Sequence, residues 1–150
     1  MTRTTSFRTA TVADAGDIAS VARSLGHEED VGLPDDFDEP RVREWIQRLG
    51  DQGTVIIAFE GSIPVAFGAI DFNTTEPETA LLAVWVSPAY RRRGLATALA
   101  EELLEFARDH GYRRIRGRLP EGNEPALSFL SSIGAMVPLR NPSMTFELPL

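Results

Sequence analysis

The arrangement of apolar and polar residues along the chain predicts two amphipathic helices followed by a group of strands. Apolar residues recur at intervals of three and four over Asp14–Leu25 and over Pro40–Leu49, which is the spacing of one helix face. The pattern then changes to continuous runs rich in β-branched residues, which predict strands at Thr54–Glu60, Ile63–Phe72 and Thr79–Val86. The third run is almost wholly apolar, so we expect a central strand that is covered on both faces.

The longest helical pattern runs from Gly94 to His110, and Gly111 is placed to cap its carboxyl end. Shorter patterns predict strands at Ser6–Thr9, Arg113–Leu119, Met136–Leu139 and Met144–Leu148, with a short helix at Pro125–Ile133. The order is therefore β-α-α-β-β-β-α-β-α-β-β, which predicts an α/β fold of the α+β type. No repeat or linker interrupts this order, so residues 1–150 are predicted to form a single domain.

Composition narrows the chemistry that the chain can carry. There is no cysteine, which excludes disulfides and thiolate chemistry, and the two histidines are not at metal-ligand spacing, so we expect no metal. No run approaches the roughly 20 apolar residues that span a bilayer. We therefore expect a cytoplasmic protein that does not bind membranes. A net charge of −7 argues against nucleic acid as a partner and favours a neutral or cationic one.

The segment between Val86 and Thr97 predicts an anion site. A turn that contains three consecutive arginines leads into the pattern Arg91-x-x-Gly94-x-Ala96 at the start of the long predicted helix. The first N–H groups of a helix have no acceptor within the helix and lie at the positive end of its dipole. Gly94 allows the backbone to approach a ligand closely, and the arginines add positive charge where a phosphate would lie.

This segment allows comparison with three other kinds of turn. A nucleotide-binding phosphate loop of the Walker type requires a lysine, and this chain has none. A dinucleotide fingerprint requires Gly-x-Gly-x-x-Gly, which is also absent. A solvated basic turn before an ordinary helix stays open on the motif alone.

The motif, the strand before it and the order of elements together resemble the GNAT superfamily of N-acetyltransferases over nearly the whole chain. A second family element, Asn-x-x-Ala followed by an apolar helix and a glycine, is matched by Asn123, Ala126 and Gly134. The resemblance implies a mixed, mostly antiparallel sheet flanked by helices, and acetyl-CoA as cosubstrate. The residues it implies for coenzyme binding are Val84, Trp85 and Val86 along the pantetheine arm, Arg91, Arg92, Arg93, Gly94, Leu95, Ala96 and Thr97 around the pyrophosphate, and Asn123.

The catalytic groups that the resemblance implies are incomplete. The tyrosine that family members commonly use as a general acid falls at Leu130, which has no proton to give. Some members carry a glutamate base at the position of Ala80. Glu78 is two residues earlier and is our first candidate for a base, and Asp71 is the second. For both acids, a solvated strand end is the alternative.

Two functions from different classes follow. The first is an acetyl-CoA-dependent N-acetyltransferase that acts on a small cationic amine or a protein amine by direct attack in a ternary complex. Seven acidic residues between Glu28 and Glu39 would attract such an amine, although a solvated loop explains them equally well. The second is a non-catalytic module that binds acyl-CoA, which the leucine at position 130 favours. Family members are often dimeric, so a homodimer is an open alternative to a monomer.

Overall fold

The computed structural model describes residues 4–25, 37–90, 93–118 and 145–149. Six strands form one sheet in chain order, and neighbouring strands are antiparallel except for β4 and β5, which are parallel. The strands are β1 (Thr5–Thr9), β2 (Thr54–Glu60), β3 (Ile63–Phe72), β4 (Thr79–Val86), β5 (Arg114–Arg118) and β6 (Thr145–Pro149). The expected mixed, mostly antiparallel sheet is therefore confirmed. The helix predicted at residues 125–133 and the strand predicted at 136–139 lie outside the described residues.

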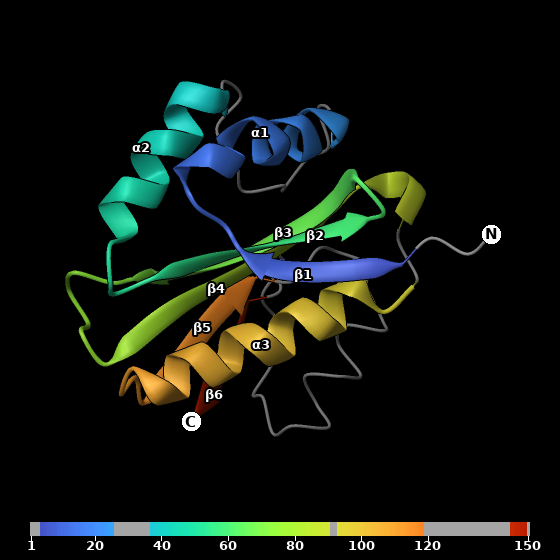
Figure 1. Ribbon diagram of the computed structural model, residues 1–150. Coiled ribbons are helices and arrows are strands. Elements are labelled where there is room, and N and C mark those ends of the chain that lie inside the picture. The colour runs from blue at the N-terminus through green and yellow to red at the C-terminus, as the bar shows by residue number, and fades with distance from the viewer. Residues whose placement is uncertain (1–3, 26–36, 91–92, 119–144, 150) are drawn as a thin grey trace.

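The helices lie on opposite faces of the sheet, as Figure 1 shows. α1 (Ala15–Ser24) and α2 (Glu39–Leu49) cover one face, and α3 (Leu95–Asp109) crosses the other. Each face has its own apolar core. Ile57 and Phe67 pack on the α1 and α2 side, whereas Leu99 and Leu103 pack with the strands on the α3 side.

Local sequence signals explain where the helices begin and end. The Asp38 side chain accepts a hydrogen bond from the Arg41 amide and so caps α2, with Pro40 in the first turn. α3 ends in a Schellman motif, in which the Gly111 amide donates to Arg108 and the Tyr112 amide to Ala107. Gly111 has a φ of 80°, a left-handed conformation that costs glycine little.

β4 departs from the expectation of a strand covered on both faces. Its ladder with β5 runs from Thr79 to Leu82 and ends there among the described residues, although β4 continues for four residues to Val86. Leu81 is 37% exposed in the middle of the strand, and the second half of β4 is only half-buried. The reason is that β4 pairs with β3 as far as Val86 but with β5 only as far as Leu82 among the described residues, so its second half is less covered.

No helix within the described parts of the chain is long and apolar enough to cross a membrane. In the same parts, no group of three or more side chains is arranged to hold a metal ion.

Candidate functional site

The start of α3 has the backbone geometry of an anion site. Gly94 precedes the helix with a φ of 79°, and a Cβ added there would meet no described heavy atom within 4 Å. The Ala98 amide donates to the Gly94 carbonyl at 3.1 Å, so the first helical hydrogen bond of α3 already involves Gly94. Leu95, Ala96 and Thr97 form the first turn, whose N–H groups have no acceptor within the helix. These N–H groups lie at the positive end of a 15-residue helix, and we call them, with Gly94, the α3 cradle.

The arginines of the turn are only partly described. Arg91 and Arg92 lie outside the described residues. The Arg93 guanidinium lies 3.3 Å from a carboxylate oxygen of Glu60 on β2 and 5.2 Å from the centre of the Tyr90 ring. Glu60 therefore holds Arg93 beside the cradle, and the arginine is exposed and within reach of an anion bound there.

β4 leads directly into this cradle. Val84 and Val86 pack toward the α3 side, whereas Trp85 points to the opposite face, as the alternation of a strand requires. The Ser87 amide donates to Val65 on β3 at 2.9 Å, which anchors the end of the strand before the turn. The expected path for a pantetheine arm therefore runs along a part of β4 that lies beyond its ladder with β5.

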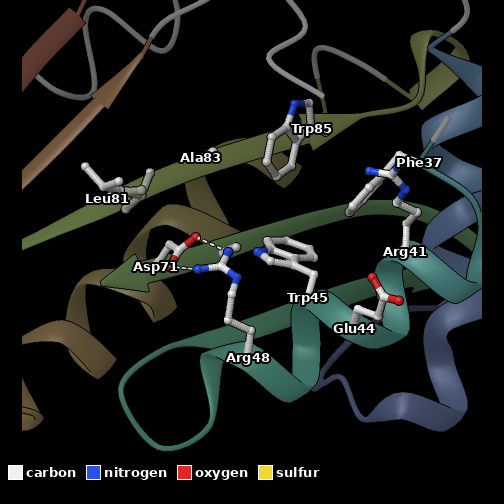
Figure 2. Close-up of a pocket in the computed structure, with 11 residues that line it drawn as sticks. Phe37, Arg41, Glu44, Trp45, Arg48, Asp71, Leu81, Ala83 and Trp85 are labelled. Carbon is white, nitrogen blue, oxygen red and sulfur yellow. Dashed lines mark hydrogen bonds and ion pairs between the residues drawn. The ribbon is translucent and has the colours of Figure 1, made fainter. Parts of the chain in front are cut away.

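A cavity of about 530 Å³ opens on the other face of β4, between that strand, β3 and α2 (Figure 2). Its described lining consists of Phe37, Arg41, Glu44, Trp45, Arg48, Ala69, Asp71, Leu81, Leu82, Ala83 and Trp85. The cavity reaches β4 at the residues where the ladder with β5 ends. The cavity and the expected pantetheine path therefore lie on the same strand, β4, near residues 82–85.

An ion pair closes one end of this cavity. Arg48 on α2 donates to both carboxylate oxygens of Asp71 on β3, at 2.9 and 3.4 Å. The same guanidinium lies 5.5 Å from the centre of the Phe72 ring, which restrains it further. Asp71 is the cross-strand partner of Leu81 on β4. The carboxylate is therefore held at a fixed place on the floor of the cavity.

Aromatic side chains form the other end. The Phe37 and Trp45 rings meet edge to face at 5.4 Å, and Trp45 meets Trp85 at 6.4 Å with an interplanar angle of 79°. Trp85 also stacks on Phe67, a fully buried side chain, at 4.8 Å. Because Phe67 belongs to the core, the position of Trp85 is set by packing beneath it.

The structure separates the two predicted base candidates. Glu78 precedes β4, is 65% exposed, lies 3.7 Å from Arg113 and does not line the cavity. It shares the strand parity of Ala80, which is fully buried on the α3 side. Asp71, by contrast, lines the cavity on the α2 side. Asn123 and Leu130 lie outside the described residues.

Sequence reasoning missed most of what α2 contributes. Arg41, Glu44 and Arg48 all line the cavity, together with Trp45. Their spacing of three and four residues places them on one helix face, and that spacing was a signal that they act together. The sequence did not indicate a role for these charged residues, because a polar stripe beside an apolar one is the ordinary pattern of a surface helix.

A strand, a tight turn and a helix that begins at a left-handed glycine form the arrangement of proteins that bind a phosphate group at a helix start. A family model described as acetyltransferase (GNAT) family matches residues 21–135. The chain belongs to this family, and the resemblance noted in the sequence is confirmed.

Individual relatives are more distant. An uncharacterised N-acetyltransferase of Methanocaldococcus jannaschii is 28% identical over 96 residues, which is 61% of this chain and 42% of that protein. The match thus spans less than half of the relative's length. The structure of an N-acetyltransferase from Staphylococcus aureus Mu50 superposes with a TM-score of 0.82 at 16% identity, covering 97% of this chain and 98% of the other. The structure of yncA from Salmonella typhimurium, a putative acetyltransferase with its cofactor acetyl-CoA, gives 0.77 at 18% identity over 97% and 94%.

Proposed function

We propose that this chain binds acetyl-CoA and transfers the acetyl group to a primary amine by direct attack in a ternary complex. The observation that carries the proposal is the left-handed Gly94 at the start of α3, followed by first-turn N–H groups that have no acceptor within the helix. Family membership and the acetyl-CoA bound to the yncA structure give further support.

The residues at the start of α3 fit a pyrophosphate. The donors are backbone N–H groups, which suit phosphate oxygens, and the helix dipole favours negative charge there. A side chain at position 94 would stand in the space in front of these donors, and glycine leaves that space open. Arg93 adds a guanidinium beside it. In the proposal, Val84, Trp85 and Val86 hold the pantetheine arm through their backbone.

The cavity on the opposite face of β4 is the proposed acceptor site. Acetyl-CoA supplies a thioester carbonyl when it is bound. The amine nitrogen forms a bond to that carbonyl carbon, the carbon–sulfur bond breaks, and the sulfur leaves with the electron pair. The amine must lose one proton before or during this step, and the thiolate must gain one.

Asp71 is the proposed proton acceptor. Its carboxylate lines the cavity and lies across from Leu81, next to the position where the β4–β5 ladder ends. Glu78 is the weaker candidate because it lies outside the cavity and pairs with Arg113. The Arg48 guanidinium keeps Asp71 oriented, so the carboxylate needs little reorganisation when the amine arrives.

Calorimetric titration with acetyl-CoA, together with a thiol-release assay over a panel of amines, tests the proposal. Micromolar binding with amine-dependent release of free thiol is the expected result. Binding without release on any amine would favour the non-catalytic acyl-CoA module. Absence of binding would overturn the assignment of the α3 cradle.

A further inference from the structure

We infer that the cavity beside β4 selects a primary amine that carries one aromatic ring and no second charge. This inference rests on the proposed function, because it names the acceptor class for the same site. It narrows the expectation of a small cationic amine or a protein amine, which the acidic residues before α2 would attract.

The formal charges of the described residues around the cavity cancel. Two arginines, Arg41 and Arg48, and two carboxylates, Glu44 and Asp71, line it. Arg48 and Asp71 neutralise each other through their ion pair. Figure 2 shows the two arginines at opposite ends of the cavity, Arg41 beside Phe37 and Arg48 beside Asp71. The described lining therefore offers no net negative charge to hold the second ammonium of a diamine or polyamine.

The walls are aromatic and apolar. Trp45 and Trp85 meet at 79°, so two aromatic side chains at nearly right angles form a corner of the cavity lining. Aromatic rings favour edge-to-face and offset contacts, so a planar ring is a better match for this corner than a flexible chain. Phe37 extends the aromatic wall along α2 by its contact with Trp45.

The floor of the cavity contains an apolar side chain that is partly exposed to solvent. Leu81 is 37% exposed, although it lies in the middle of a central strand of the sheet. Burial of such a side chain under a ligand ring removes apolar surface from water and favours binding. Because Leu81 lies across from Asp71, a ring over Leu81 would hold an attached amine near that carboxylate.

The chain offers a direct reporter of this cavity. It contains two tryptophans, and both of them, Trp45 and Trp85, line the cavity. Intrinsic tryptophan fluorescence therefore reports ligand entry without any requirement for catalysis. The probes are 2-phenylethylamine, its saturated analogue 2-cyclohexylethylamine, and 1,4-diaminobutane.

The first experiment compares kcat/KM for thiol release with these three amines. We expect 2-phenylethylamine to exceed 1,4-diaminobutane by about tenfold or more and 2-cyclohexylethylamine by a smaller factor. We also expect 2-phenylethylamine to change the tryptophan fluorescence at concentrations where 1,4-diaminobutane does not. A higher kcat/KM for the diamine would overturn the inference and leave the proposed acetyl transfer standing.

Substitutions of Trp45 test whether this side chain determines the preference for an aromatic amine. Trp45→Leu is expected to lower kcat/KM for 2-phenylethylamine about tenfold, and Trp45→Phe to restore most of it. Affinity for acetyl-CoA, measured by calorimetry, should be unchanged in both variants. Phe106→Leu is the matched control, since Phe106 is a half-buried aromatic residue on α3, on the other face of the sheet. An equal loss in Phe106→Leu would overturn the inference.

The two proposals fail in distinguishable ways. If no amine releases thiol but 2-phenylethylamine still changes the fluorescence, the aromatic ligand class stands and the acetyl transfer is overturned. If thiol is released and none of the amines alters the fluorescence, the acceptor binds elsewhere and the inference is overturned.

Discussion

Arg48 on α2 and Asp71 on β3 are joined by a bidentate ion pair, with Nη2 of the arginine 2.9 Å from Oδ2 of the carboxylate. The pair links a helix to the sheet at the edge of the cavity. It fixes the carboxylate across from Leu81 on β4, and both residues border the cavity. An acid in this position can receive a proton from a group that enters the cavity.

Replacement of that acid tests its role. Asp71→Asn keeps the shape but removes the proton acceptor, so we expect kcat for amine-dependent thiol release to fall about 100-fold. Acetyl-CoA affinity should be unchanged, since Asp71 lies outside the α3 cradle. Glu78→Gln tests the competing candidate, and we expect its kcat to stay within about twofold, because an exposed strand-end pair contributes little. The reverse pattern would assign the base to Glu78.

The cradle is tested by a matched pair of glycines at the two ends of α3. Gly94 and Gly111 both have a φ near 80°, and at both positions an added Cβ would meet no described atom within 4 Å. Valine at either position carries a similar left-handed strain of about 1–2 kcal/mol. We expect Gly94→Val to weaken acetyl-CoA binding about 100-fold or more and Gly111→Val to leave it unchanged.

Thermal unfolding of both variants provides the control for that pair. Similar losses of Tm with different affinities would assign the binding defect to the cradle. Wild-type affinity in a folded Gly94→Val protein would contradict the cradle assignment.

Tyr112 predicts how stability changes at alkaline pH. Burial raises the pKa of Tyr112 above its ordinary value of 10.0, and the nearby Asp71 carboxylate raises it further. A group with a raised pKa in the folded state stabilises the fold fully below its unfolded pKa. That contribution is lost as the pH rises through the folded pKa. The wild-type protein should therefore lose stability above pH 10 more steeply than Tyr112→Phe.

Tyr112→Phe should also lower the stability of the fold at neutral pH. The Tyr112 hydroxyl donates to the Gln52 carbonyl at 2.6 Å, and loss of this hydrogen bond should destabilise the fold by about 1 kcal/mol. Urea unfolding at neutral and alkaline pH measures both effects. Parallel curves for the two proteins across this range would contradict the assignment.

Gly53 predicts a large loss of stability from a small change. A Cβ at this position would lie 2.4 Å from the carbonyl oxygen of Ile70, a backbone atom of β3 that cannot move without disturbing the sheet. We expect Gly53→Ala to destabilise the fold by about 2–3 kcal/mol. Gly16→Ala is the control. Gly16 lies in α1, and a Cβ there would make only an ordinary contact with the side chain of Glu39, the first residue of α2. That variant should be neutral or stabilising by up to about 1 kcal/mol. Equal denaturation midpoints for the two variants would contradict the expected clash.

Much of the fold follows from local patterns. The predicted ranges of β2, β3 and β4 agree with the structure at every boundary, since β-branched runs bounded by glycine, asparagine and proline leave few alternatives. α3 begins and ends within one residue of the prediction because a left-handed glycine lies at each end. The proposal of a cradle at this turn could be made from the sequence for the same reason, since its donors belong to consecutive backbone positions.

The proposed acceptor cavity was decided by the tertiary structure. Its lining residues lie up to 48 positions apart in the sequence, from Phe37 to Trp85, and no local pattern reports that they meet. The sequence suggested Glu78 over Asp71 by proximity along β4, whereas pairing across strands brought Asp71 to the cavity. By itself, the sequence determined the elements and the glycine-containing turn before α3, because both depend on neighbouring residues. The proposed proton acceptor and the aromatic corner depend on side chains from different elements, and only packing brought those together.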